Sequence, residues 1–411
     1  MVGKQKGWVT NRLGNVTSKI GSGATPRGGG ETYKATGISL IRSLNVHDEG
    51  FREAKLARID DEQAARLSSV VVEADDVLFN ITGASVARCC LAPASFLPAR
   101  VNQHVSIIRP AKGKFVPAFL HYLLISNLYK DRLLSTGEGG STRQAITKAQ
   151  LQDFTIEYPE SLSEQQRIVG LLDEAFDGVA IAKASAEKNL QNARALFESH
   201  LQSVFTHARE RWEEKLLKGL CKLITKGSSP KWQGIDYVNK PGILFVTSEN
   251  VGEYQLRMDK PKYVEDKFNI KDKKSILKYG DVLTNIVGAS IGRTAIFDLD
   301  AVANINQAVC LMRCEHTLLD NRYLAYFLNS PVLIQVLHDN EVNNARANLS
   351  LGFFSTLPIP LPPLSEQKKI VAKLDDFRVE TQKLESIYQQ KVAALVELKK
   401  SLLDQAFTGQ L

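Results

Sequence analysis

The sequence predicts an α/β protein of the α+β type, with two similar mixed domains separated by two long antiparallel coiled-coil helices in an internal pseudo-twofold repeat. Three observations predict this architecture. The 411 residues match themselves at an offset of 202 to 205, apolar residues follow coiled-coil spacing at the end of each half, and short apolar runs alternate with polar turns before it. Because 44% of the residues are apolar, the chain can bury a core in each half.

The repeat is strongest around one polar turn. Residues Asp76–Arg88 align with Asp281–Arg293 at an offset of 205, and both runs contain the tripeptide Gly-Ala-Ser. Further matched pairs are Trp8 and Trp212, Gly23 and Gly227, Pro26 and Pro230, Asn102-Gln103 and Asn306-Gln307, and Ser163-Glu164-Gln165 and Ser365-Glu366-Gln367. So small a drift in offset indicates two copies of one unit. The expected segments are a first domain at 1–160, a central helix at 161–211, a second domain at 212–363 and a C-terminal helix at 364–411.

The sequence predicts a mixture of strands and helices in each of the two domains. Short apolar runs predict strands at 38–41, 70–72, 76–81 and 105–108, with counterparts at 243–246 and 309–312. Buried short helices are expected at 119–124 and 323–328.

The two long helices follow from apolar residues whose spacing alternates between four and three. Each helix would run for about 45 residues, or roughly 65 Å at 1.5 Å per residue. Because the second domain lies between them in the chain, the helices are expected to pair antiparallel, with the two domains at opposite ends of a rod. The predicted helix-pair core comprises Ile168, Leu172, Val179, Leu196, Val204, Ile370, Leu374, Leu384, Leu395, Leu398 and Leu402.

Several classes of protein are excluded. No apolar run approaches 18 residues, so no transmembrane helix is expected, and the N-terminus lacks the apolar stretch of a signal peptide. The five cysteines are odd in number and sparse, which favours a reducing cytoplasm over a disulfide framework. Phosphate-loop, zinc-protease and nucleophile-elbow motifs are absent, so we expect no catalytic residues. Cys310, Cys314 and His316 have no partner pair in the first copy, and a metal is not expected there.

The polar residues that recur in both copies indicate nucleic-acid binding. Asn and Gln can bind adenine bidentately, and Arg can bind guanine or phosphate. The competing interpretation is that Asn and Ser cap turns, and it is favoured for Gly83, Ala84, Gly288 and Ala289 as packing elements. The candidate DNA-binding residues are Thr25, Arg27, Arg42, Asn45, Asn80, Thr82, Ser85, Arg88, Asn102, Gln103, His104, Arg143, Gln144, Lys226, Ser229, Lys231, Thr247, Asn250, Asn285, Ser290, Arg293, Asn306, Gln307 and Arg346.

The distribution of charge and of similarity supports this interpretation. The chain carries a net charge of +7, with 20 basic and 15 acidic residues in 1–160, while the helical segments are close to neutral. An ordinary solvated surface would also account for so small an excess. The matched scaffolds carry divergent loops at 46–72 and 251–277, so the two domains would read two different short sequences. Unlike domains on one chain would therefore read an asymmetric, split site rather than a palindrome.

Two junction motifs resemble the specificity subunits of type I restriction-modification systems. They are Leu162-Ser163-Glu164-Gln165-Gln166-Arg167-Ile168-Val169 and Pro360-Leu361-Pro362-Pro363-Leu364-Ser365-Glu366-Gln367-Lys368-Lys369-Ile370-Val371. The second is similar to the family's signature where a target recognition domain meets a conserved helix. The run from Gly280 to Arg293 also resembles this family, and the order domain, helix, domain, helix covers nearly the whole chain.

The resemblance implies a non-catalytic subunit that reads double-stranded DNA. Each target recognition domain would dock in a major groove and read one half of a bipartite target, and the helices would set the spacer. The implied partners are two methyltransferase (M) subunits, which bind S-adenosylmethionine and methylate adenine, and two restriction (R) subunits, which use ATP and Mg²⁺ to cleave unmodified DNA. The chain itself would bind no cofactor and would not contact a membrane.

The two copies also depart from each other. The first junction has fewer prolines than the second, His104 aligns with Ala308, and Gln144 aligns with Ala347. A coiled-coil scaffold with two protein-binding domains and no role on DNA is the alternative interpretation. Binding that is insensitive to salt and absent on duplex DNA would favour that alternative.

Overall fold

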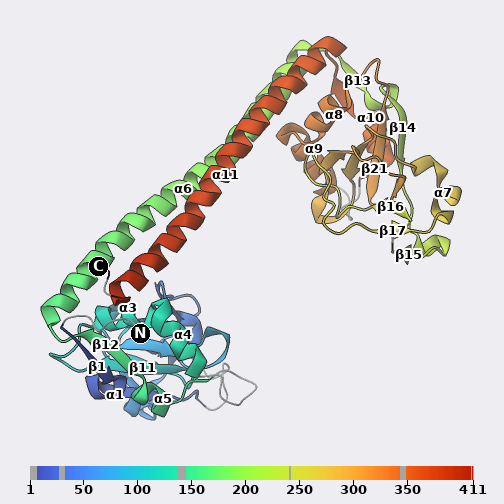
Figure 1. Cartoon of the computed structure of the whole chain (residues 1–411). Helices are drawn as coiled ribbons and strands as arrows, with labels where there is room; N and C mark the ends of the chain where they lie inside the picture. The colour runs from blue at the N-terminus through green and yellow to red at the C-terminus, as the bar shows by residue number, and fades with distance from the viewer. Residues whose placement is uncertain are drawn as a thin grey trace. The chain divides into compact units, whose positions relative to one another are not determined.

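The computed structural model describes residues 7–26, 33–136, 145–239, 242–342, 349–408 and 410. The chain divides into two compact units, of which the first comprises Met1–Ala186 with Gln390–Leu411 and the second Glu187–Gln389. Each unit therefore holds one mixed domain and one half of each long helix (Figure 1). Mixed α+β content in two similar domains confirms the predicted fold class. Within the described residues, no helix is both long and apolar enough to cross a membrane.

The first domain is built around two four-stranded sheets. One has the strand order β2-β11-β8-β9, and the other has the order β6-β3-β10-β7. Their bounds are Thr17–Ser22 (β2), Ile38–Ile41 (β3), Ala57–Ile59 (β6), Val71–Val72 (β7), Val77–Asn80 (β8), Cys89–Leu91 (β9), Ala99–Val101 (β10) and Val105–Pro110 (β11). Strands β3 and β10 are parallel, whereas β11 is antiparallel to both of its neighbours.

The second domain repeats the first of these sheets strand for strand, whereas its other sheet shares three strands and has its fourth strand at the opposite edge. Its sheets have the orders β14-β21-β18-β19 and β15-β17-β16-β20, and the parallel pair is β16 with β20. The bounds are Cys221–Lys226 (β14), Tyr237–Val238 (β15), Ile243–Val246 (β16), Tyr263–Val264 (β17), Val282–Asn285 (β18), Thr294–Ile296 (β19), Ala303–Ile305 (β20) and Val309–Cys314 (β21). The sequence repeat is thus a structural repeat.

Short helices and edge strands complete each domain. In the first they are α1 (Leu13–Val16), α2 (Asp61–Ala65), α3 (Pro117–Ile125), α4 (Asn127–Thr136), α5 (Lys148–Asp153) and the pair β1 (Trp8–Arg12) with β12 (Thr155–Pro159). In the second they are α7 (Lys267–Lys271), α8 (Asn321–Leu328), α9 (Pro331–Val342), α10 (Leu351–Thr356) and the pair β13 (Glu214–Leu216) with β22 (Pro358–Pro360). Helices α3 and α8 are buried, as the apolar runs predicted.

One buried ion pair recurs in each domain, between an aspartate just before β8 or β18 and an arginine in β11 or β21. The Arg109 guanidinium binds the Asp76 carboxylate, with Nε and Oδ1 2.7 Å apart, and the Arg313 guanidinium binds Asp281 with Nη2 and Oδ2 2.7 Å apart. Both aspartates also accept a hydrogen bond from the backbone three residues before them, at Glu73 and Lys278. Because a buried carboxylate needs such partners, the pair explains why an aspartate starts the best-matched run of the repeat.

The long helices are α6 (Leu162–Arg211) and α11 (Leu364–Thr408). In the first unit the ammonium group of Lys399 lies 4.7 Å from the ring centre of Phe176. In the second unit Phe197 stacks on Phe377 with ring centres 6.3 Å apart. Along the helix pair, residue numbers increase in α6 where they decrease in α11. The paired halves are therefore antiparallel within each unit (Figure 1).

The helix seam differs from the predicted one at three positions. Ile168, Leu172 and Leu374 are buried, but Leu196, Leu384 and Leu398 are exposed and must be removed from the predicted core. Val179, Val204, Ile370, Leu395 and Leu402 are half-buried. An α-helix has 3.6 residues per turn rather than 3.5, so a strict heptad pattern drifts away from the contact line. In the second half of α6, Phe197 contacts Phe377 of α11, whereas the buried Phe205 packs on Tyr323 and Phe327 of α8.

A buried glutamine fastens each long helix to the domain that precedes it. Gln165 accepts a hydrogen bond from the Val116 amide at 2.8 Å and donates to the Pro159 carbonyl at 2.9 Å. Gln367 does the same with the Asp320 amide at 2.9 Å and the Pro362 carbonyl at 2.8 Å. Two turns further along, the tyrosine hydroxyls of α3 and α8 donate to aspartates of the long helices, namely Tyr122 to Asp173 at 2.5 Å and Tyr326 to Asp375 at 2.7 Å.

Candidate nucleic-acid interface

The repeated Gly-Ala-Ser turn closes a tight loop in both domains. The backbone amide of Asn80 donates to the Arg88 carbonyl at 2.8 Å, and the backbone amide of Ala87 donates to the Asn80 carbonyl at 2.9 Å. Asn285 makes the same pair of bonds with Arg293 and Gly292, both at 2.9 Å. Gly83 and Gly288 have φ values of 75° and 78°, a conformation that glycine adopts without strain. The two loops therefore project from equivalent strand ends with the same backbone.

The asparagines at the base of this loop are structural. Asn80 and Asn285 are fully buried, and their side-chain amides donate to the carbonyls of Ser43 at 3.0 Å and Ser248 at 2.9 Å. Each bond ties the Gly-Ala-Ser loop to the neighbouring segment of the other sheet. We remove both residues from the candidate contact set, because a side chain with no exposed surface does not reach a partner in this structure.

Other candidates are also turned inward. Asn45 is fully buried and donates to the Arg52 carbonyl at 2.8 Å, and Asn250 donates to Arg257 at 3.0 Å. The buried hydroxyl of Thr247 bonds to Asn250, while the buried Asn102 caps its own turn by accepting from the His104 amide at 3.0 Å. These residues fit the turn-capping interpretation of a repeated polar residue. Asn306 caps the equivalent turn and is half-buried.

A glycine brings a second loop against this turn. The Gly23 amide donates to the Asn102 carbonyl at 3.1 Å. A Cβ atom at Gly23 would lie 1.8 Å from the Val101 carbonyl oxygen, and one at Gly227 would lie 1.8 Å from the Ile305 carbonyl oxygen. Both positions thus require glycine, since no side chain fits the approach. The close contact places Thr25 beside Gln103.

In the first domain an open hollow of about 490 Å³ lies beside the Gly-Ala-Ser loop. It is lined by Ser43, Leu44, His47, Thr82, Gly83, Ala84, Ser85, Arg88 and His104. Four of the candidate residues, Thr82, Ser85, Arg88 and His104, therefore meet at one surface. The hollow combines a guanidinium, hydroxyls and an imidazole, which suits a polar and negatively charged partner. Within the described part of the chain no ion pair is formed by Arg88.

A row of hydrogen bonds runs along the rim of this hollow. Thr25 is bonded to Gln103, the Gln103 amide nitrogen lies 3.1 Å from Nε2 of His104, and Nδ1 of His104 lies 2.6 Å from the Thr82 hydroxyl. Gln103 itself is exposed. The row links three loops that are far apart in the sequence.

The equivalent surface of the second domain carries different groups. Val287 stands where the first domain has Thr82, and Ala308 stands where it has His104, so the second domain lacks the two side chains at that end of the row. Gln307 is exposed, as are Lys226 and Lys231, and Ser229 is half-buried. Ser290 accepts a hydrogen bond from Asn285 at 3.1 Å, while Arg293 lies 3.9 Å from the carboxylate of Glu253.

Some candidates contribute elsewhere or fall outside the structure. Arg42 bonds the Lys55 carbonyl and lies 5.1 Å from the ring centre of Tyr33, so it stabilises its own loop. Arg27, Arg143, Gln144 and Arg346 lie outside the described residues.

Three residues of the hollow, Ser43, Leu44 and His47, are not among the candidates predicted from the sequence. They lie close to Asn45, which recurs in the second domain as Asn250. The repeat therefore marks this loop, but it marks the buried asparagine and not the residues that line the hollow.

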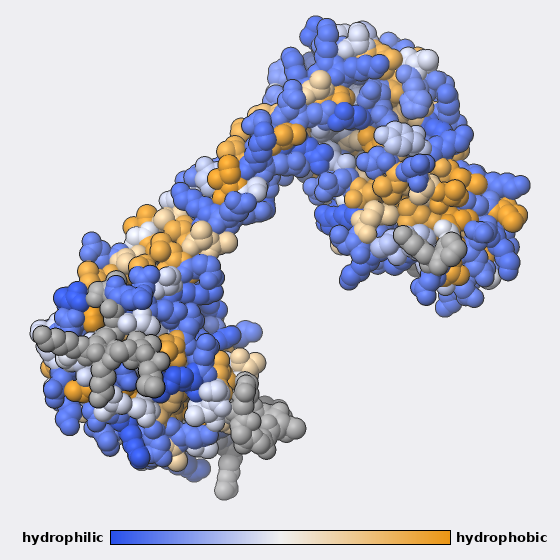
Figure 2. Space-filling view, viewed as in Figure 1, coloured by the Kyte–Doolittle hydropathy of each residue, from blue (hydrophilic) through white to orange (hydrophobic). Residues whose placement is uncertain are grey.

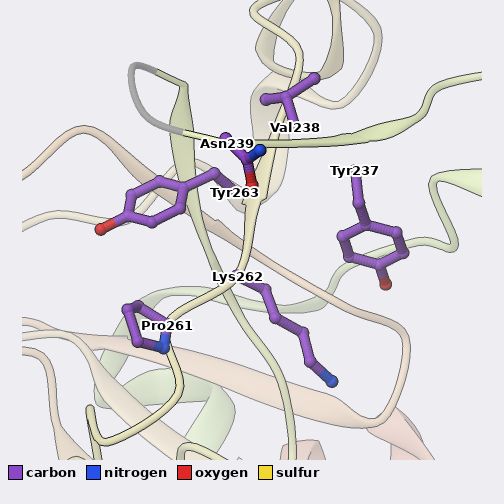
Figure 3. A pocket seen from close by; sticks show the side chains of 6 residues that line it. All are labelled: Tyr237, Val238, Asn239, Pro261, Lys262 and Tyr263. Carbon is purple, nitrogen blue, oxygen red and sulfur yellow. The ribbon is translucent and has the colours of Figure 1, made fainter.

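A second hollow, of about 450 Å³, lies at strands β15 and β17 of the second domain (Figure 3). Its lining comprises Tyr237, Val238, Asn239, Pro261, Lys262 and Tyr263. The ring of Tyr237 and the side chain of Lys262 extend to the same side, and the Lys262 ammonium group is paired with Glu249 at 2.8 Å. The lining has no acid and base placed together, and nothing in it indicates catalysis.

Cys90 and the buried His121 are poorly suited to nucleophilic or acid–base chemistry. Burial raises the pKa of the Cys90 thiol to about 12, and burial lowers the pKa of His121 to about 4. Neither group therefore titrates near neutral pH, and both lie inside the first domain. Among the described residues no three histidine, cysteine or carboxylate side chains form a metal-binding group.

Comparisons with known proteins all identify members of one family as similar to this chain. Residues 5–190 and 209–392 match the model of the type I restriction modification DNA specificity domain. Over 339 residues the chain is 24% identical to the EcoBI specificity subunit of Escherichia coli, covering 76% of this chain and 70% of that protein. It is 20% identical over 357 residues to the MjaVIII specificity subunit of Methanocaldococcus jannaschii, covering 83% and 80%.

Two solved structures share the fold. One comes from a study of complex assembly and conformational transition in the type I R-M system, with a TM-score of 0.79, 21% identity and 99% of both chains covered. The other is the HsdS subunit from Thermoanaerobacter tengcongensis, with a TM-score of 0.63, 22% identity, and coverage of 99% of this chain and 98% of that one.

Proposed function

Because the chain belongs to the type I restriction modification DNA specificity family, we propose that each of its two domains reads one half of a bipartite, asymmetric DNA target. The observation that carries this proposal is the pair of equivalent surfaces with unequal side chains. The Gly-Ala-Ser loops have the same backbone, yet Thr82 and His104 of the first domain are replaced by Val287 and Ala308 in the second. One scaffold with two sets of contacts would select two different half-sites.

The exposed polar groups suit contact with DNA in the major groove. Gln103 and Gln307 project from equivalent turns, and Arg88 and Lys231 supply cations for base edges or phosphates. The charge excess is small, so these contacts alone would give weak binding. The partner subunits of the complex would supply the remaining affinity.

The long helices are proposed to set the distance between the half-sites. Gln165 and Gln367 fasten the helices to the domains through buried hydrogen bonds, so the helices leave the domains in a fixed direction. A continuous helix of 50 residues and another of 45 make stiff spacers. The spacer between half-sites would then follow the number of helical turns.

The same helices are proposed to dock two methyltransferase subunits. Figure 2 shows apolar side chains at the surface of the helix pair. The exposed large apolar residues on α6 and α11 are Leu171, Ile181, Leu196, Val379, Leu384, Ile387, Val396 and Leu398. Exposed apolar surface of this extent on a helix is typical of a protein interface. S-adenosylmethionine would bind to the methyltransferase subunits, and ATP with Mg²⁺ to the two restriction subunits.

Expression of the chain with its methyltransferase subunits in a host without adenine methylation tests this function. Long-read sequencing of the host DNA should show N6-methyladenine at one split, asymmetric motif, and omission of the chain should abolish it. Methylation of the same motif without the chain would contradict the proposal. If no motif is methylated, salt-insensitive binding to partner proteins and no binding to duplex DNA would support the scaffold alternative.

A further inference from the structure

The side chain of Gln103 is fixed at the surface by partners on both sides. With the amide oriented as in the structure, the Thr25 hydroxyl donates to Oε1 of Gln103, and the Gln103 amide donates to Nε2 of His104 over 3.1 Å. Nδ1 of His104 then donates to the Thr82 hydroxyl over 2.6 Å. Every group in this row finds a complementary partner if His104 is neutral.

The row leaves half of the amide's hydrogen-bonding capacity free. A glutamine amide has two N–H donors and two oxygen lone pairs, and the row uses one of each. One N–H and one lone pair remain on an exposed side chain. Turning the amide over would reverse every donor in the row and leave the same free pair, so this count does not depend on the orientation.

A donor and an acceptor side by side match one base edge in the major groove. Adenine presents N7 as an acceptor and N6–H as a donor, which glutamine binds bidentately. We propose that Gln103 reads an adenine in the half-site of the first domain, held for this task by Thr25, His104 and Thr82. This inference rests on the proposed function, and adds to it the base and the residue that reads it.

The second domain provides the contrast. Its equivalent glutamine, Gln307, is exposed but stands beside Ala308 and faces a loop with Val287 in place of Thr82. The side chains of alanine and valine form no hydrogen bond, so Gln307 lacks the support that His104 and Thr82 give Gln103 and should lose more rotamer freedom on binding. The fixed amide of Gln103 should therefore distinguish adenine from the other bases more strongly than Gln307 distinguishes the base that it contacts.

Selection from a pool of randomised duplexes tests the assignment. The complex of this chain with its methyltransferase subunits should select a split motif with an invariant adenine in the first half-site. Gln103→Ala should make that one position degenerate, with discrimination falling about 5- to 150-fold, the range expected for loss of a bidentate contact. The other positions and the spacer should be unchanged, which shows that the variant is folded. Gln166→Ala, at an exposed glutamine of α6, is the matched control and should keep the full motif.

Gln103→Glu provides an independent variant of the same shape. A carboxylate only accepts hydrogen bonds, so it should lose the preference for adenine and favour cytosine, whose N4 amino group donates. If adenine is retained at every position with both variants, the inference is wrong while the proposed function stands. If the unaltered complex selects no motif at all, the proposed function itself fails.

A 7-deazaadenine duplex checks the contact atom. This base lacks the N7 acceptor, and at the assigned position it should weaken binding by the unaltered complex about tenfold but cause no further loss with Gln103→Ala. Independent, additive losses would overturn the assignment, because two groups in contact do not behave additively.

Discussion

Gln165 and Gln367 make the same set of hydrogen bonds in the two halves of the chain. Each accepts from a backbone amide of its domain, at 2.8 and 2.9 Å, and each donates to a proline carbonyl at the domain–helix junction, at 2.9 and 2.8 Å. Both side chains are fully buried. This equivalence gives the repeated Ser-Glu-Gln tripeptide a physical meaning, since the glutamine fixes the start of each helix on its domain.

Loss of either glutamine should destabilise its own unit. Each glutamine also donates to a second carbonyl, that of Lys114 or Leu318. Gln165→Ala or Gln367→Ala therefore removes the side-chain partner of one backbone amide and two carbonyls, at a cost of about 1–3 kcal/mol for each group left unsatisfied. Denaturant unfolding of the full chain should show this loss. The exposed neighbours Gln166 and Lys368 serve as controls, and their alanine variants should change stability by less than about 0.5 kcal/mol. Equal effects at the buried and exposed positions would show that the anchor is unimportant.

The matched glycines at the proposed DNA surface should not tolerate a side chain. In Gly23→Ala the new Cβ collides with the Val101 carbonyl, so the loop must move and Thr25 leaves Gln103. We expect a loss of about 1–3 kcal/mol in stability, as for an overpacked site, and weaker selection at the first half-site only. Gly178→Ala on α6 meets no atom within 4 Å and should instead stabilise the helix by about 0.5–1 kcal/mol. Unaltered selection by Gly23→Ala would contradict this view of the loop.

The first domain should lose stability in acid through His121. Burial lowers the pKa of this histidine from 6.5 to about 4, and its ring donates to the Cys89 carbonyl over 3.2 Å. Because the folded pKa is lower than the unfolded pKa, the folded state binds fewer protons. The stabilisation is complete above pH 6.5 and is lost as the pH falls towards 4, by up to about 3 kcal/mol.

The second domain offers a natural comparison, since Ala325 stands where the first has His121. In His121→Ala the dependence of stability on pH between 6.5 and 4 should become shallower, whatever the change in stability at pH 7. Unfolding followed at several pH values measures this slope. A slope identical to that of the unaltered chain would mean that other groups cause the acid sensitivity.

Shortening the long helices should shorten the spacer of the target. Removal of residues 183–189 from α6 together with 387–393 from α11 deletes one heptad from each helix and nearly preserves their faces. Seven residues correspond to about 10 Å, or about three base pairs at 3.4 Å each. Methylome sequencing should find both half-sites intact with a spacer about three base pairs shorter. An unchanged spacer would refute the idea that the helices act as a ruler.

Repeats and apolar periodicity were enough to predict the α+β class, the two similar domains and the two long helices. They could not separate polar residues that face solvent from those that hold the fold together. Asn80 and Asn285 recur because each ties two sheets together from a buried position, which produces the same sequence signal as a shared contact with DNA. Leu196 was misplaced because the heptad pattern ignores the drift of a real helix.

The row of hydrogen bonds from Thr25 to Thr82 could not be predicted from the sequence, for a different reason. Its members come from three loops, and only the close approach at Gly23 and the turn at Asn102 bring them together. Tertiary contacts of this kind leave no local pattern. The junction motif, by contrast, did identify Gln165 and Gln367, although their hydrogen bonds became apparent only in the structure.

The central claim is that one scaffold, used twice with different side chains, reads two half-sites. A chain in which residues 212–363 replace residues 1–160 tests it most directly, with the methylated motif in a host without adenine methylation as the measurement. The two domains would then be identical, so the motif should become symmetric, with the second half-site repeated in inverted orientation. Persistence of the original first half-site in that motif would contradict the account.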